Sequence, residues 1–345
     1  MRAGDRRRAR WGAVLVTLTL GVAACSAGAA TAQRLPAPVR SGRPGATARP
    51  APVVDPARVH ADELGAVPVL MYHQLVAHPA GDYDQTPAQF RTELTQLYAH
   101  HFRTITAGAL ADRRVDLPAG TSPMVLTFDD STLSQYAELP DGRVAPNCAV
   151  GILLSVARAY GELRPVASFY VNAHPFGGRA AALRTLAHLG MELGDHTATH
   201  ANLGRLDAGG VQRELARGQE VITSAVRGAT VSTMALPYGV LPRHRALAHA
   251  GASAGTSYEF RGVLLVGAGP AGSPYAKGFA PEALPRIRSG RRTGDQRFTS
   301  TYWLRRLFTG AARPYVSDGD PGRISFPKAV ARGLDPRFAA LAQPY

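Results

Sequence analysis

Two pairs of polar side chains have the residue types and the spacing that divalent-metal chemistry requires. Asp129 and Asp130 are adjacent and directly follow an apolar run, Met124–Phe128. His196 and His200 stand four residues apart, just after a short run at residues 191–194. Residues at i and i+4 of a helical turn lie on one face, so both imidazoles can reach one cation. Two imidazoles and one carboxylate form an open ligand set, as at catalytic metal sites.

Adjacent carboxylates can take two different roles in such a site. Neighbouring side chains on an extended segment point in opposite directions, so one aspartate can bind the metal while the other faces a water molecule. A divalent ion would lower the pKa of that water to about 7 and polarise a substrate carbonyl. Each pair also has a structural explanation, since Asp129 and Asp130 could cap a helix and the histidines could belong to a polar turn. The position of both pairs at the ends of predicted strands favours the metal site.

Alternating apolar segments predict the scaffold that must bring these two pairs together. Nearly continuous apolar runs, expected for strands buried on both faces, occupy residues 67–72, 124–128, 166–171, 191–194, 231–236 and 263–266. Segments with helical patterning alternate with them at residues 87–101, 150–160, 180–189, 209–226, 243–250 and 301–308. This order predicts an α/β fold with a parallel sheet, and six or more repeats over about 250 residues favour a closed or nearly closed barrel.

The first sixty residues predict export and a tether. Five arginines precede Trp11–Ala24, which is apolar but only fourteen residues long, too short to span a membrane and suited to a signal peptide. The segment ends in Val-Ala-Ala-Cys, which resembles a bacterial lipobox with Cys25 as the acylated residue. We therefore expect a lipoprotein signal peptide at residues 1–24 and a flexible Ala/Pro-rich tether at residues 25–62. The protein would stand on the outer face of the cytoplasmic membrane; the alternative is cleavage near Ala30 and secretion.

The composition excludes several other classes of protein. The 345 residues are 45% apolar, which excludes wholesale disorder. The net charge is +14, but 37 of the 39 basic residues are arginines scattered without a nucleic-acid-binding motif, so we expect no nucleic-acid partner. Two cysteines exclude a disulfide-stapled scaffold. If Cys25 carries lipid, Cys148 has no partner in the chain and is expected to be a small buried apolar residue.

Four segments in the same order resemble the motifs of the polysaccharide deacetylases, the NodB homology domain of carbohydrate esterase family four. They are Val125–Asp130, Ala167–Val171, His196–His200 and Leu236–Gly239. The opening Pro68–His73 is similar to the branch that contains exported poly-N-acetylglucosamine deacetylases. The resemblance covers roughly residues 66 to 290. We therefore predict a deacetylase domain at residues 63–312 and a C-terminal extension of unknown role at residues 313–345.

The resemblance implies both a fold and a mechanism. It implies a distorted (β/α) barrel of about seven parallel strands, with Asp130, His196 and His200 as metal ligands, most often for Zn²⁺. It implies that Asp129 is the general base and that the backbone N–H of Tyr238 stabilises the oxyanion. The expected substrate is an N-acetylated extracellular or cell-wall polysaccharide, which loses acetate by hydrolysis.

The sequence departs from the family pattern at three places. Ser131 follows the aspartates where many members have glycine. The arginine that often orients the base is missing before Pro237, and Arg286 is a candidate replacement from a later strand end, or else a surface arginine. The late Leu-x-His motif that usually supplies the general acid is also missing. His73 is the candidate acid, although a core histidine bonded to backbone would look the same.

Two further interpretations stay open at this point. Asp195 could orient a metal ligand or could simply cap the turn before His196. The enzyme could instead be an O-deacetylase of the acetyl-xylan type. The missing arginine and the missing late histidine also leave room for a carbohydrate-binding homologue that has weakened or lost turnover.

Overall fold

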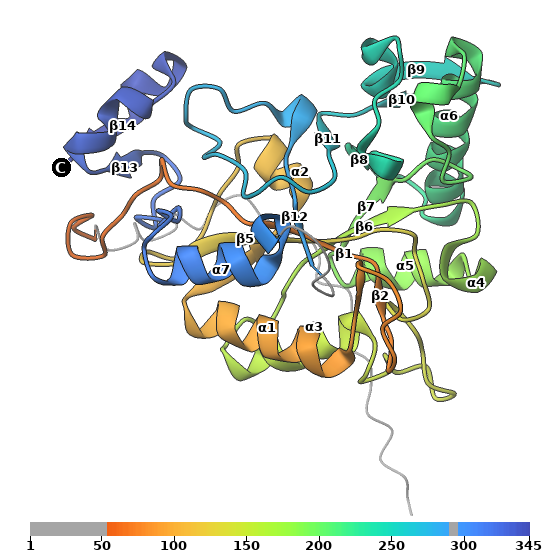
Figure 1. Cartoon of the computed structure of the whole chain (residues 1–345), viewed down its shortest axis with the longest axis horizontal. Helices are drawn as coiled ribbons and strands as arrows, with labels where there is room; N and C mark the ends of the chain where they lie inside the picture. The colour runs from red at the N-terminus through yellow and green to blue at the C-terminus, as the bar shows by residue number, and fades with distance from the viewer. Residues whose placement is uncertain (1–53, 290–295) are drawn as a thin grey trace, which may run out of the picture. The chain divides into compact units, whose positions relative to one another are not determined.

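The structure, a computed structural model, describes residues 54–289 and 296–345 of the chain (Figure 1). The chain divides into two units, residues 1–49 and residues 50–345, and every described residue belongs to the second. The predicted signal peptide, Cys25 and most of the predicted tether therefore lie outside the described residues. Within the described ranges, none of the helices is long and apolar enough to cross a membrane.

The centre of the fold is a curled parallel sheet. Seven strands pair in the order β11-β8-β7-β6-β5-β1-β12, and β4 pairs with the first half of β5. Every pairing within this sheet is parallel. In chain order the strands are β1 (Val69–Tyr72), β4 (Phe102–Ile105), β5 (Ser122–Phe128), β6 (Ser168–Val171), β7 (Glu192–Asp195), β8 (Thr233–Ala235), β11 (Gly262–Leu264) and β12 (Ile287–Arg288). The predicted distorted barrel of about seven parallel strands is confirmed.

The two edges of this sheet approach each other. Leu264 at the end of β11 forms a parallel bridge with Leu284, three residues before β12 begins. The backbone N–H of Leu265 donates to the carbonyl of Leu284 at 2.9 Å. All seven residues of β5 are buried, which is why the central strands read as continuous apolar runs without alternation.

Helices cover the sheet between successive strands. They are α1 (Pro87–Ala99), α2 (Ala107–Ala111), α3 (Ala149–Ala159), α4 (Pro175–Gly178), α5 (Ala181–His188), α6 (Ala208–Ala225) and α7 (Ser300–Phe308). Thr86 begins α1 with a reciprocal capping box to Gln89. The apolar stripe of α1 that the sequence predicts, which includes Phe90 and Leu94, is buried. The predicted helix bounds lie within a few residues of the observed ones, except at residues 243–250.

The predicted helix at residues 243–250 is wrong. Only Arg245–Ala248 forms a short 3₁₀ turn, and the chain then enters an antiparallel hairpin, β9 (Ala250–Ser253) and β10 (Thr256–Glu259), that packs on α6. The residues of β9 are small and lack the branched side chains that mark a strand in sequence. A second pair of short strands, β2 (Gln74–Leu75) and β3 (Asp84–Gln85), follows β1.

The C-terminal residues pack against the segment that precedes β1. Two short strands, β13 (Ile324–Phe326) and β14 (Ala342–Pro344), pair with each other, and Val316 bridges to Asp62. Tyr315 is fully buried, and its hydroxyl donates to Glu63 at 2.9 Å. Burial raises the pKa of Glu63 to about 8, against the hydrogen bonds that it accepts from Ser325 and Tyr315. Residues 314–326 therefore belong to the same packed unit as the sheet.

Candidate metal centre

The two polar pairs follow the ends of two strands at the carboxyl edge of the sheet. Asp129 directly follows β5 and His196 directly follows β7, with β6 between these strands. Their loops turn sharply. Ten non-glycine residues in the described ranges have positive φ, and five of them belong to the predicted motifs: Asp130, Ser131, Thr197, His200 and Tyr238. Such backbone conformations cost energy and cluster at functional sites.

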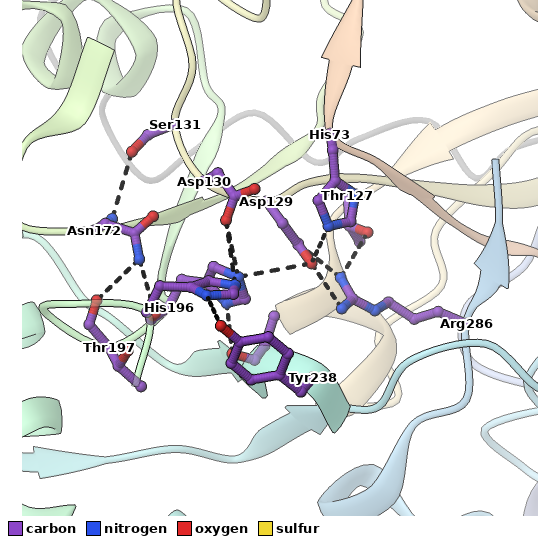
Figure 2. A network of polar contacts seen from close by, with 12 residues as sticks. His73, Thr127, Asp129, Asp130, Ser131, Asn172, His196, Thr197, Tyr238 and Arg286 are labelled. Atoms are coloured by element: carbon purple, nitrogen blue, oxygen red, sulfur yellow. Dashed lines mark hydrogen bonds and ion pairs between the residues drawn. The ribbon is translucent and has the colours of Figure 1, made fainter. Parts of the chain in front are cut away.

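The three predicted metal ligands converge. Figure 2 shows the Asp130 carboxylate turned toward the His196 ring, and its Oδ1 lies 3.4 Å from Nε2 of His196. The same Oδ1 lies 3.6 Å from Nε2 of His200. One ligand atom from each of the three side chains lies within 4.8 Å of the other two. The sequence therefore identified three donors that the fold brings to one point from two loops.

The neutral tautomer of His196 that this environment allows would suit a cation between these atoms. Its Nδ1 lies 2.8 Å from the backbone carbonyl of Ala235, which can only accept, so Nδ1 must carry a proton. In the neutral ring, Nε2 then presents a lone pair. This Nε2 is buried, has no hydrogen-bond partner in the part of the chain that the structure describes, and faces the Asp130 carboxylate. Two electron-rich atoms that face each other in a buried site are well matched to a shared divalent cation.

The other imidazole is held from outside by a tyrosine. Nδ1 of His200 lies 3.2 Å from the hydroxyl of Tyr238, and the two rings are 4.7 Å apart, edge to face. Tyr238 is 62% exposed, so this contact is open to solvent, unlike the carbonyl that holds His196. If Nδ1 donates to the hydroxyl oxygen, Nε2 is left free to face Asp130.

Replacing Tyr238 by phenylalanine is expected to weaken Zn²⁺ binding by about tenfold, because groups that orient a ligating histidine typically contribute 10–100-fold in affinity. The measurement is the Zn²⁺ dissociation constant of the metal-stripped protein by titration calorimetry. Tyr160→Phe, at a partly exposed tyrosine that ends α3, is the matched control and should leave the constant unchanged. Equal constants for Tyr238→Phe and the starting protein would show that the hydroxyl does not hold His200.

Asp129 faces the same space from the other side and is clamped by arginine. The Arg286 guanidinium donates to both carboxylate oxygens, Nη1 to Oδ1 at 2.7 Å and Nη2 to Oδ2 at 2.8 Å. Its Nε donates to the carbonyl of Leu265 at 2.6 Å, and its side chain is wholly buried. Burial alone would raise the pKa of Asp129, but the Arg286 guanidinium outweighs burial and holds that pKa well below its usual range. Asp129 is therefore an ionised carboxylate at neutral pH.

Comparisons with known proteins agree with this site. The sequence model of the polysaccharide deacetylase family matches residues 117–255, which include both aspartates and both histidines of the site. Residues 117–255 are therefore similar to a polysaccharide deacetylase domain. The resemblance that the motifs indicate is thereby confirmed. A search of curated protein sequences returns no match.

Solved structures share the fold of this deacetylase domain. A polysaccharide deacetylase from Bacillus cereus is 19% identical, with a TM-score of 0.51, over 69% of this chain and 69% of that one. A Bacillus anthracis protein assigned to the same group is 19% identical, with a TM-score of 0.51, over 68% of this chain and 67% of that one. IcaB from Ammonifex degensii is also similar, at 19% identity and a TM-score of 0.46, over 72% of this chain and 97% of that one.

His73 lies beside Asp129 in the deacetylase site. Its Nε2 is 3.8 Å from Oδ2 of Asp129, and its Nδ1 is buried with no hydrogen-bond partner among the described residues. Its ring packs against Tyr83 with 4.7 Å between ring centroids. Burial lowers the pKa of His73, against the attraction of Asp129 and Asp130, so the ring is neutral at pH 7. A core histidine tied to backbone through its ring does not describe this arrangement.

Two side chains that the sequence analysis did not single out hold the loops of the site. The Asn172 amide donates to the carbonyls of His196 at 3.0 Å and Thr197 at 3.1 Å. The Gln135 amide donates to the carbonyl of His73 at 2.7 Å and also to that of Asp129. Asn172 directly follows β6, and a polar residue at a strand end is a usable signal. Gln135 lies in a loop where nothing in the sequence marks it.

Asp195 and Ser131 each have a local role in a turn of the site. The carboxylate of Asp195 accepts from the backbone N–H of Thr197 at 2.6 Å, so it caps the turn. Burial raises the pKa of Asp195 to about 8. Ser131 has φ of 46°, in the left-handed region that glycine adopts freely, which accounts for glycine in many members. Its carbonyl accepts from the N–H of Phe176 at 2.7 Å, which fixes this turn.

Proposed function

We propose that this deacetylase removes N-acetyl groups from an extracellular or cell-wall polysaccharide, with Zn²⁺ held by Asp130, His196 and His200. The observation that carries the proposal is the meeting of two different carboxylates at one site. Asp130 faces two imidazole nitrogens that suit a shared cation. Asp129, its neighbour, is kept ionised by Arg286 and lies 4.0 Å from the same His196 nitrogen. This pairing of a ligand set with a free base fits metal-assisted hydrolysis.

Each residue of the site then has a defined task. A bound divalent ion would polarise the acetyl carbonyl and make water a better nucleophile. Asp129 accepts a proton from the attacking water, whose oxygen bonds to the carbonyl carbon. Arg286 keeps both oxygens of Asp129 in place, because a bidentate pair fixes the plane of a carboxylate. The backbone N–H of Tyr238 donates to the oxygen on which negative charge develops.

The second half of the reaction needs a proton donor. The bond between the carbonyl carbon and nitrogen breaks, acetate leaves, and the sugar amine must receive a proton. We assign this task to His73, whose Nε2 lies 3.8 Å from Oδ2 of Asp129. A neutral imidazole this near to Asp129 can take up, through a bridging water, the proton that Asp129 gains from the attacking water, and can pass it to the amine. In this scheme one proton leaves the attacking water and one proton reaches the sugar amine.

Arg286 also argues against a homologue that has lost turnover. The sequence lacks an arginine before Pro237, and that absence was one reason to consider a binding protein. Arg286, the residue directly before β12, supplies a guanidinium to Asp129. Arg286 therefore provides the guanidinium that the sequence lacks before Pro237.

His200→Ala is expected to lose both Zn²⁺ and activity, since it removes one of three ligands. The measurements are metal content per chain after dialysis and acetate release from N-acetylglucosamine oligomers, with acetylated xylan as the competing substrate. His188→Ala, at an exposed histidine on α5, should behave as the unchanged protein. Full metal content in His200→Ala would remove it as a ligand. Acetate released from xylan alone would replace the N-acetyl substrate with an O-acetyl one.

We further propose that the domain is exported and anchored to the outer face of the cytoplasmic membrane through lipid on Cys25. Cys25→Ser should therefore move the protein from the membrane fraction to the soluble fraction, measured by immunoblot after cell fractionation. Cys148→Ser is the control and should leave the protein on the membrane, because Cys148 caps α3 and serine can serve the same purpose. Membrane fractionation of Cys25→Ser would defeat the proposed anchor.

A further inference from the structure

A second hollow lies between α1 and α7. Figure 1 shows these two helices next to each other, and a cavity of about 960 Å³ opens between them. This volume is at the upper end of the range for small-molecule sites. The mechanism described above uses none of its lining residues. The side chains that matter for its chemistry are Gln89, Thr92 and Gln96 from α1 and Thr301, Arg305 and Phe308 from α7.

The groove is also lined by a half-buried carboxyl group that already accepts hydrogen bonds from hydroxyls. Glu93 accepts hydrogen bonds from Tyr72 at 2.6 Å and from Ser289 at 3.2 Å, and Ser300 donates to its other oxygen. Burial raises the pKa of Glu93 against these bonds. Gln85 also lines the groove and is only 6% exposed, yet its Oε1 has no hydrogen-bond partner in the described ranges.

The chemistry of the walls matches an uncharged, hydroxyl-rich polymer. Amide and hydroxyl groups can both donate and accept, which suits sugar hydroxyls and acetamido groups. Phe308 gives one apolar wall, and the His100 ring stacks parallel on it at 4.0 Å. Arg305 is the exposed full charge among the lining residues, since Glu93 is held under the hydroxyls. A strongly acidic or strongly basic partner would find few opposite charges to pair with in this groove.

The groove is also connected to the metal centre. Tyr72, whose hydroxyl reaches Glu93, is the residue before His73. Gln85 lies two residues from Tyr83, whose ring packs on His73 at 4.7 Å. Arg288 also contacts Tyr83, and its guanidinium lies 5.6 Å from the centroid of the Tyr83 ring. One short segment, Tyr83 to Gln85, therefore contributes to both the groove and the surroundings of the proposed acid.

We propose that the groove between α1 and α7 binds a further stretch of the same N-acetylated glycan whose acetyl group reaches the metal centre, so that the enzyme favours long chains over short ones. The inference rests on the proposed function. It goes beyond that function by assigning a second binding region and a dependence on chain length. A glycan that crosses Tyr83 would place one part over His73 and Asp129 and a later part against Thr92 and Gln96.

A matched pair of tryptophan substitutions tests the groove. Thr92 and Thr95 are both exposed, lie on α1, and both donate their hydroxyl to the carbonyl four residues earlier, at 3.0 and 2.8 Å. Thr92 lines the groove, whereas Thr95 does not. The measured quantity is the ratio of kcat/KM for acetate release from the N-acetylglucosamine hexamer to that from the dimer. Thr92→Trp should lower this ratio about tenfold, the effect of losing one or two net hydrogen bonds, and Thr95→Trp should leave it unchanged.

A second variant and a binding measurement keep the result decisive. Gln96→Ala removes a groove amide without adding bulk, and it should lower the same ratio if Thr92→Trp fails to fold. Titration calorimetry with the hexamer measures binding to the groove without turnover. Both groove variants should weaken this binding. An unchanged ratio and unchanged hexamer affinity would overturn the groove proposal while leaving the deacetylase intact. If the starting protein releases no acetate from any N-acetylated oligomer, the proposed function fails, and hexamer binding alone decides the groove.

Discussion

Asp129→Asn is expected to keep its full complement of Zn²⁺ and to lose acetate release by about 10³-fold, within the range found for general bases. Asparagine has nearly the same shape, so the ligand loop of Asp130 should stay in place. Its amide cannot take a proton from water, however, and it can no longer pair with both nitrogens of Arg286. Loss of rate with retained metal is the signature of a base, because a ligand variant would lose both.

The measurements are the initial rate on the N-acetylglucosamine hexamer and metal content by mass spectrometry of the dialysed protein. Asp141→Asn changes an exposed aspartate that pairs with Arg143, and it should keep both metal and rate. A rate for Asp129→Asn within a few fold of the unchanged protein would remove Asp129 as the base. Loss of metal in that variant would make it a ligand instead.

The elements that the sequence predicts well are those with strong local patterning. Strands β5 and β6 are buried on every residue, and their apolar runs stand out in any short window. Helix α1 has both a capping signal and an apolar stripe. The three predicted metal ligands could be found for the same reason. The aspartate and the pair of histidines each lie within a few residues after an apolar run. Local signals suffice when the fold itself brings strand ends together.

The parts that the sequence could not decide depend on distant contacts. Arg286 is 157 positions from Asp129, and the sequence offered it as a candidate without deciding between a role at the base and a place on the surface. The strand that places it, β12, has only two residues and no pattern of its own. The packing of Tyr315 on Glu63 joins residues 252 apart and is equally invisible in sequence. In each case a buried polar pair is formed by chain topology, and local composition carries no trace of it.

Arg286→Met is expected to lower the free energy of unfolding by about 3–5 kcal/mol, because it leaves the Asp129 carboxylate buried without its partner. Both side chains are almost wholly buried, so water cannot replace the lost guanidinium. The measurement is urea unfolding of the purified domain. Arg164→Met, at an exposed arginine, is the control and should change the free energy by less than about 0.5 kcal/mol. A change of that small size for Arg286→Met would show that the ion pair does not hold this site together.

A double variant distinguishes the interaction between Asp129 and Arg286 from the other contributions that Arg286 makes to stability. With Asp129→Asn in place, the buried partner is neutral, and removing Arg286 no longer strands a charge. Asp129→Asn/Arg286→Met should therefore be more stable than Arg286→Met alone, with a coupling free energy of about 1–3 kcal/mol. Arg286→Lys should fall between the single variant and the unchanged protein, since lysine keeps the charge but cannot form the bidentate pair. Strict additivity of the two substitutions would mean that the guanidinium stabilises the barrel through Leu265 and Thr127 and not through Asp129, and its assigned part in holding the base would have to be withdrawn.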